Sequence, residues 1–150
     1  MSLRVCPIAP VCVPLDRVWS FLVEPANFSL WWHGKTRGVD PLGSAHAGQR
    51  IHAQSRTLGI PYNVDLLVER VDERLHALDV MISIPFGIII FTHASCTALN
   101  SSSSQLSFGC EFSFSPVWWG WLLERFASQP LYRGVASTLL RVKTAAEEAG

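Results

Sequence analysis

Histidine and cysteine side chains have the widest chemistry in this chain, which has five of the first and four of the second. The histidines show no HxH, HxxxH or HExxH spacing, and so predict no metal site: His33, His46, His52, His76 and His93. The cysteines form no CxxC pair and are expected to be free thiols: Cys6, Cys12, Cys96 and Cys110. No GxSxG, GxxxxGK[ST] or GxGxxG segment is present. We therefore expect neither a metal nor a cofactor.

His76 is the sharpest chemical candidate because it falls on the apolar face of a predicted strand. A histidine in apolar surroundings needs a hydrogen bond or a ligand, so both a hydrogen-bonded core residue and an acid–base group remain open. His93 is a second candidate if its strand turns that side inward. Tyr62 would then be the polar group that orients a bound molecule.

Length and composition limit the class of protein. The chain has 150 residues and a mass of 16.6 kDa, which suits a single domain over residues 1–150. Apolar residues make up 49% and charged residues 16% of the sequence, which excludes a disordered chain. Twelve Lys and Arg balance twelve Asp and Glu without a basic block, so no nucleic-acid partner is expected.

Neither the N-terminal segment nor the most apolar window indicates export or membrane insertion. Residues 1–14 contain three prolines and alternate like a strand, unlike a signal peptide. The apolar window 80–91 is interrupted by Pro85 and Gly87 and is shorter than the ~20 residues of a membrane-spanning helix. These features predict a cytoplasmic protein.

The hydrophobic period divides the chain into helices and strands. A strand at 3–9 is followed by short helices at 15–23 and 26–32, the first of which begins after Pro14. Alternation with period two then predicts six strands: 36–40, 49–57, 62–71, 74–84, 88–99 and 105–114. Helical spacing returns over 117–149, with a kink expected at Pro130. The fold class is therefore α+β, an antiparallel sheet of about seven strands covered by one long helix.

Charged residues indicate which side of each strand faces water. Asp65, Glu69, Asp79 and Glu111 belong in solvent, so their neighbours along each strand face inward. The side chains expected inside are Tyr62, Val64, Leu66, Val68, His76, Leu78, Val80, Ile82, Leu106, Phe108, Cys110, Phe112 and Phe114. No charge decides strand 88–99, so either Phe91 with His93 or Ile90 with Thr92 faces inward.

Two segments carry a family resemblance. The segment Pro14-Leu-Asp-Arg-Val-Trp19-Ser-Phe-Leu22, followed by Trp31, is similar to the P-x-x-x-V-W-x-x-L…W opening of bacterial SRPBCC proteins. Trp119-Gly-Trp-Leu-Leu-Glu-Arg125 precedes a long helix, as it does in those proteins. Over nearly its whole length the chain resembles the SRPBCC, START and birch-pollen-allergen superfamily. Among its members, the bacterial polyketide cyclase/dehydrase and lipid transport proteins are most similar. The resemblance implies a helix-grip fold.

The resemblance also implies a cavity between sheet and helix for lipids, sterols, hormones, quinones or polyketide intermediates. The corresponding ligand-binding residues here are Tyr62, Val64, Leu66, His76, Leu78, Val80, Ile82, Phe91, Phe108, Phe112, Trp118, Leu122 and Phe126. Alternate hairpin turns of a meander lie at one end of the sheet, where they either form a ligand entrance or are ordinary turns. The residues of this predicted entrance are Gly59, Pro61, Pro85, Phe86, Gly87 and Pro116.

Three hypotheses for the function follow. The favoured one is a binding or transport protein for an apolar small molecule, acting as a monomer or a homodimer. The second is a cyclase, dehydratase or isomerase that uses His76 or His93 as acid–base group and Tyr62 as a donor. The third is a protein-interaction module with a packed core, which the low charge content permits.

Overall fold

The computed structural model describes residues 2–31, 35–57, 59–85, 87–114 and 118–149, without the side chains of residues 2, 3, 30, 31, 57, 114, 118–132 and 149. The elements in chain order are β1 (Ser2–Val5), β2 (Ile8–Val11), α1 (Leu15–Leu22), the 3-10 helix η1 (Pro25–Trp31), β3 (Lys35–Asp40), β4 (Arg50–Thr57), β5 (Ile60–Asp72), β6 (Ala77–Ile84), β7 (Ile88–Ala98), β8 (Ser104–Phe114) and α2 (Trp118–Ala149).

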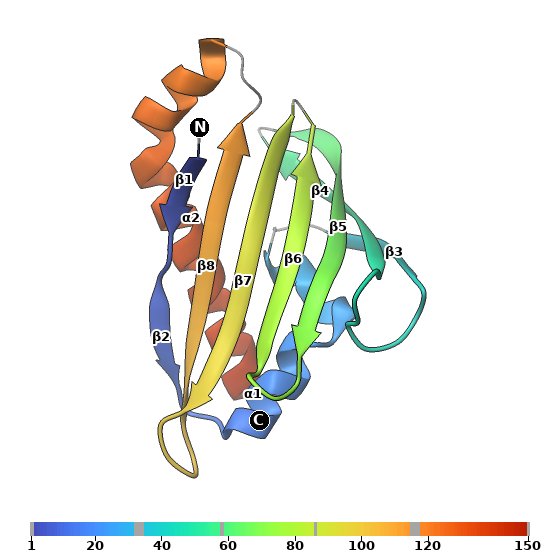
Figure 1. Ribbon diagram of the computed structural model, residues 1–150, viewed down its shortest axis with the longest axis vertical. Helices are drawn as coiled ribbons and strands as arrows, with labels where there is room; N and C mark the ends of the chain where they lie inside the picture. Colours follow the sequence, from blue (N-terminus) through green and yellow to red (C-terminus); the bar gives the residue numbers. More distant parts are fainter. Residues whose placement is uncertain (1, 32–34, 58, 86, 115–117, 150) are drawn as a thin grey trace.

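The described strands form one open antiparallel sheet of eight strands in the order β1-β8-β7-β6-β5-β4-β3, with β2 also paired to β8. The helices α1, η1 and α2 lie together on one face of this sheet, here called the inner face (Figure 1). Helix α2 packs against β1, β2, β8 and η1. The predicted α+β architecture, an antiparallel sheet covered by a C-terminal helix, is confirmed.

The first predicted strand, 3–9, is wrong in one respect, because the structure divides it into β1 and β2. The break falls at Cys6 and Pro7. Proline has no backbone N–H to donate to a ladder. The Pro7 carbonyl still accepts a hydrogen bond from the Phe108 N–H at 3.1 Å, so the chain stays on β8 across the break. This division explains why there are eight strands and not seven.

Alternation along the strands follows the charges, as predicted. Asp65 and Glu69 are exposed, whereas Val64, Leu66 and Val68 are buried. In strand β7, which the sequence left undecided, Ile90 and Thr92 face inward and are buried. Phe91 and His93 therefore face outward.

Helix α2 covers the inner face through residues spaced by four, three and four positions: Val135, Leu139, Val142 and Ala146, all buried. Near its end, a Glu147 carboxylate oxygen accepts the Cys12 N–H at 3.1 Å and links α2 to the end of β2. The side chains around the kink predicted at Pro130 lie outside the described residues. None of the helices described in residues 2–149 is long and apolar enough to cross a membrane.

The turn between β5 and β6 is held against α1. Trp19 on α1 is buried, and its indole Nε1 donates a hydrogen bond to a Glu73 carboxylate oxygen at 2.6 Å. The His76 ring meets the Trp19 ring edge-on, with centroids 5.4 Å apart. His76 has a φ of 52°, a left-handed conformation that a strand does not allow. The predicted strand 74–84 is therefore wrong at its start, and His76 lies in the turn.

We expect Glu73→Ala to lower the free energy of unfolding by about 1–3 kcal/mol, because it removes a charged acceptor from the partly buried Trp19 indole. Glu73→Gln retains a hydrogen-bond acceptor, so its free energy of unfolding should fall by less. Urea denaturation measures both variants, with Arg74→Ala in the same turn as the control. Equal stability of Glu73→Ala and Arg74→Ala would contradict this role.

Candidate functional site

The inner face between the sheet and α2 is the candidate site, and its sheet side is strongly apolar. Strands β5, β6 and β8 contribute seven of the predicted ligand-binding residues to it, each at most 5% exposed: Val64, Leu66, Leu78, Val80, Ile82, Phe108 and Phe112. Their burial is as predicted from the alternation. Their contact with a ligand remains a prediction.

The helix side of the site was predicted to carry Trp118, Leu122 and Phe126. These side chains lie outside the described residues, although α2 itself begins at Trp118 and is the next element after β8. On the described part of α2, the residues that face the interior are aliphatic: Val135, Leu139, Val142 and Ala146.

Two polar pairs interrupt the apolar sheet side, and each pair joins neighbouring strands. Ser55 on β4 is buried and lies directly opposite Tyr62 on β5, which is half-buried. Thr92 on β7 lies opposite Cys110 on β8, with Thr92 Oγ1 3.7 Å from Cys110 Sγ. Sequence reasoning missed the second pair as a site feature. A threonine within an otherwise apolar strand was the available signal, but it could not be used before the facing of that strand was known.

The two inner-face thiols are protected from ionisation. Burial raises the pKa of Cys96 to about 12. Burial also raises the pKa of Cys110 to about 11, although the hydrogen bond with Thr92 opposes this shift. A low dielectric disfavours the charged thiolate, so both groups are neutral at physiological pH. They can therefore line a binding site but are poor nucleophiles.

Three predicted site residues lie elsewhere than expected. Phe91 is 41% exposed on the outer face, and His93 is exposed beside it, so neither lines the interior. His76 lies in the β5–β6 turn against Trp19 rather than on a strand. Periodicity alone could not place these residues, since β7 carries no charge to fix its facing and a left-handed turn residue is not visible in the pattern.

The predicted entrance turns do share one end of the sheet. Pairing of Thr57 with Ile60, of Ile84 with Ile88, and of Ile88 with Phe114 places the β4–β5 turn, the β6–β7 turn and the end of β8 together, at the top of Figure 1. Gly59 and Gly87 adopt φ values of 79° and 74°, which the turns require. Pro61 is exposed and Pro85 half-buried, and Phe86 and Pro116 lie outside the described residues.

Metal chemistry has no support in the described part of the chain. No three His, Cys, Asp or Glu side chains there come close enough together to hold a metal ion. Among the described inner-face side chains of β4 to β8, the ionisable groups are Tyr62, Cys96 and Cys110.

Comparison with known proteins places the fold. No protein-family model matches the sequence, and none of the curated proteins does. Among solved structures, the chain is similar to the Zhui aromatase/cyclase from a Streptomyces species, with a TM-score of 0.78, 14% identity and coverage of 99% of this chain and 95% of that one.

Two further solved structures share the same architecture. Norcoclaurine synthase from Thalictrum flavum, in complex with dopamine and hydroxybenzaldehyde, gives a TM-score of 0.71 at 12% identity over 100% of this chain and 89% of that one. Ara h 8.0201 gives 0.70 at 11% identity over 99% of both chains. The chain thus has the helix-grip fold of the SRPBCC and birch-pollen-allergen-like proteins. At these identities the likeness defines the fold and leaves the ligand and the activity open.

We expect thiol-labelling reagents to divide the four cysteines into two classes. Cys6 and Cys12 are exposed, whereas Cys96 and Cys110 are buried with raised pKa values. At pH 8 the native protein should label two thiols quickly, and the other two should react only in urea.

The raised pKa values of Cys96 and Cys110 also predict that the free energy of unfolding falls as pH rises above about 9. In that range the thiols of the unfolded chain lose protons that the folded ones keep.

Peptide mapping after a short exposure to iodoacetamide identifies the labelled positions. Rapid labelling of Cys110 in the native protein would contradict the closed inner face.

Proposed function

We propose that the protein binds an apolar small molecule between its sheet and α2, such as a lipid, a quinone, a sterol-like molecule or an aromatic polyketide. The observation that carries this proposal is the composition of the inner face. Its sheet side joins buried aliphatic and phenyl groups from three strands with two polar pairs, Ser55 with Tyr62 and Thr92 with Cys110. A site that is mostly apolar, with a few placed polar groups, is typical of small-molecule binding.

The energetics of such a site are adequate without any charged contact. Each 100 Å² of apolar ligand surface removed from water contributes on the order of 2.5 kcal/mol before the ordering costs. A hydroxyl or carbonyl group on the ligand would then be oriented by Tyr62, which lies two residues from the β4–β5 turn and so near the proposed entrance. The entrance itself is supported by the gathering of the turns at one end of the sheet.

The inner face favours binding over acid–base catalysis. Its described ionisable groups are the phenol of Tyr62 and the thiols of Cys96 and Cys110, and burial raises the pKa values of the two thiols. A general acid–base group works best when its pKa lies near the working pH. The similar solved structures include an aromatase/cyclase and norcoclaurine synthase, so cyclisation is the alternative function that the likeness in fold suggests.

Substitution of Val80 by Phe distinguishes a cavity from a packed core. Val80 is 1% exposed at the centre of the inner face, between Val68 and Thr92 on the neighbouring strands. If a ligand cavity lies there, Val80→Phe should remain folded, lose less than about 1 kcal/mol and bind ligand at least tenfold more weakly. Overpacking of a solid core would instead cost about 1–3 kcal/mol.

Binding is measured by the fluorescence of anilinonaphthalenesulfonate and its displacement by a fatty acid, a sterol, a quinone and an aromatic polyketide. The control is Met81→Phe, one residue away on the opposite face of β6. Failure of the wild-type protein to bind any of these compounds, together with a strongly destabilised Val80→Phe, would overturn the proposal.

A further inference from the structure

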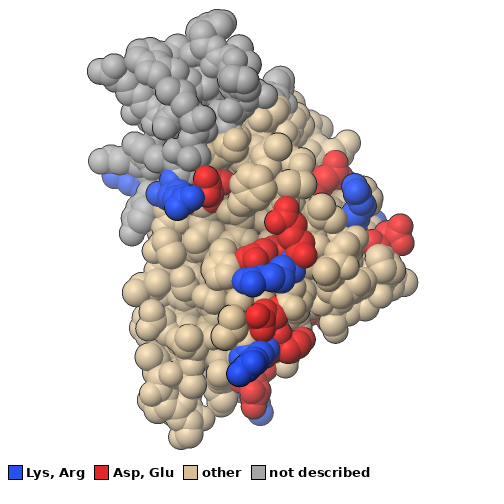
Figure 2. Space-filling model, in the orientation of Figure 1, with Lys and Arg blue, Asp and Glu red and all other residues tan. Residues whose placement is uncertain are grey.

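The outer face of the sheet carries an ordered set of ion pairs that the proposed inner site does not use. Charged side chains gather on this face over the middle strands (Figure 2). Arg4 Nε lies 3.1 Å from a Glu111 oxygen, and Arg70 Nε lies 3.0 Å from Asp79 Oδ2. His52 Nδ1 and Asp65 Oδ1 form a third pair at 2.8 Å.

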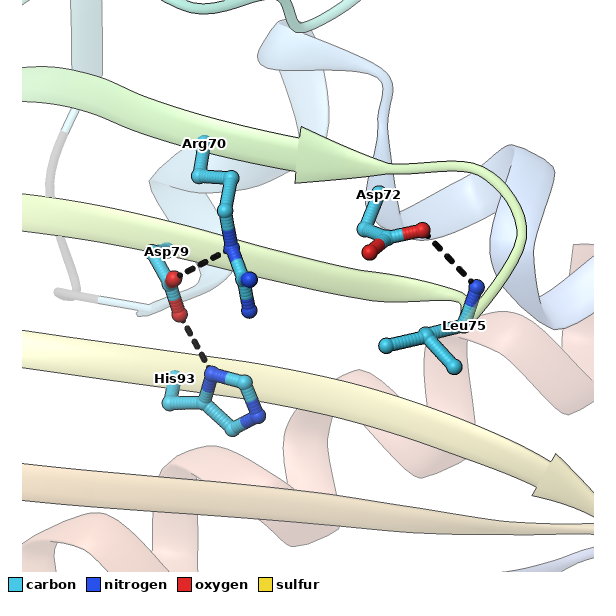
Figure 3. A network of polar contacts seen from close by, with 5 residues as sticks. All are labelled: Arg70, Asp72, Leu75, Asp79 and His93. Carbon is cyan, nitrogen blue, oxygen red and sulfur yellow. Dashed lines mark hydrogen bonds and ion pairs between the residues drawn. The ribbon is translucent and has the colours of Figure 1, made fainter.

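One histidine is held by a chain of two such contacts. His93 Nδ1 is hydrogen-bonded to Asp79 Oδ1, while the other oxygen of Asp79 is held by Arg70 (Figure 3). The strand register places these residues side by side on β5, β6 and β7. A carboxylate at Nδ1 fixes the tautomer with the proton on that nitrogen and leaves Nε2 as the basic atom.

Next to His93 the sheet surface is hollow because β8 has a glycine there. His93 lies opposite Gly109 in the register, and a cavity of about 260 Å³ opens at this place. Its lining includes the exposed Phe91 and the carboxylates of Glu69 and Glu111. This cavity therefore combines an aromatic residue, Phe91, with a histidine that can accept a proton.

The thiol of Cys6 lies on the other side of the same hollow. A Cβ placed on Gly109 would be 3.6 Å from Cys6 Sγ and 3.9 Å from His93 Cβ. The thiol sulfur and His93 Cβ are therefore at most 7.5 Å apart. A proton transfer between the two side chains would cross this gap directly or through one water. Ser107 Oγ lies 3.6 Å from Cys6 Sγ and provides a hydroxyl beside the sulfur.

We propose that Cys6 is a thiol–disulfide exchange site in which His93 is the base, and that it takes small disulfides carrying an ammonium group. His93 Nε2 accepts the thiol proton, and the Cys6 thiolate attacks one sulfur of the disulfide. The disulfide S–S bond breaks as the new S–S bond to Cys6 forms. The leaving thiolate takes the proton back from His93, so the products are a mixed disulfide on Cys6 and one free thiol.

The preference for a cation follows from the charges around the hollow. Arg4 neutralises Glu111, and Arg70 shares Asp79 with His93. Glu69 also lines the cavity and forms no ion pair among the residues that the structure describes. Its carboxylate is therefore available to an ammonium group, and Phe91 offers an aromatic face to the adjoining methylene groups.

The experiment measures the rate at which cystamine forms a mixed disulfide with each thiol of the native full-length chain, followed by peptide mass spectrometry at neutral pH. Cys12 is the internal control, since it is also exposed and its neighbourhood includes the Glu147 carboxylate. Cys6 should react at least about tenfold faster than Cys12, after each rate is divided by its value in urea. With the anionic disulfide dithiodiglycolate, the ratio of the Cys6 rate to the Cys12 rate should be smaller.

Two matched variants test the base. His93→Gln should reduce the normalised Cys6 rate to that of Cys12 and change the shape of its pH profile. His52→Gln alters the other His–Asp pair of the outer face and should leave the Cys6 rate unchanged. If His93→Gln does not fold, Asp79→Asn should also reduce the Cys6 rate, because it alters the carboxylate that holds His93. Equal normalised rates for Cys6 and Cys12, or an unaltered Cys6 rate and pH profile in His93→Gln, would overturn the proposal.

Discussion

The structure depends on one constraint, which is that a sheet with one apolar face must have that face covered. Helix α2 is the long element that packs on this face, where it contacts β1, β2 and β8 and the helices η1 and α1. Among the described side chains of α2, four aliphatic residues on one stripe are buried, and Glu147 links the end of the helix to the Cys12 amide. Because one helix is narrower than a sheet of eight strands, such a fold is suited to enclosing a ligand between the two layers.

The same constraint explains how much could be predicted from the sequence. Charges such as Asp65 and Glu69 can only face water, and in strands a single charge determines the facing of all its neighbours. The described inner positions of β5 and β8, and those of β6 from Leu78 onward, were therefore placed correctly. The element order and the long terminal helix followed from the change of hydrophobic period, and the resemblance to helix-grip proteins agreed with them.

The remaining features depend on tertiary context. Strand β7 has no charge, so its partners on β6 and β8 decide that Thr92 faces inward and His93 outward. His76 leaves the strand because the turn requires a left-handed residue and Trp19 offers its ring a partner. The Thr92–Cys110 pair and the hollow over Gly109 arise only when distant segments are in register. The two faces thus separate an apolar interior from a charged exterior, and the proposed binding site and the proposed thiol site lie on opposite faces of the sheet.

Native mass spectrometry of the freshly purified protein, followed by solvent extraction, tests the central claim most directly. The account predicts a reproducible adduct of an apolar small molecule that the extraction releases and identifies. It also predicts that the released compound binds again to the stripped protein. A bare polypeptide mass, together with no rebinding by fatty acids, sterols, quinones or aromatic polyketides, would contradict it and indicate a packed core.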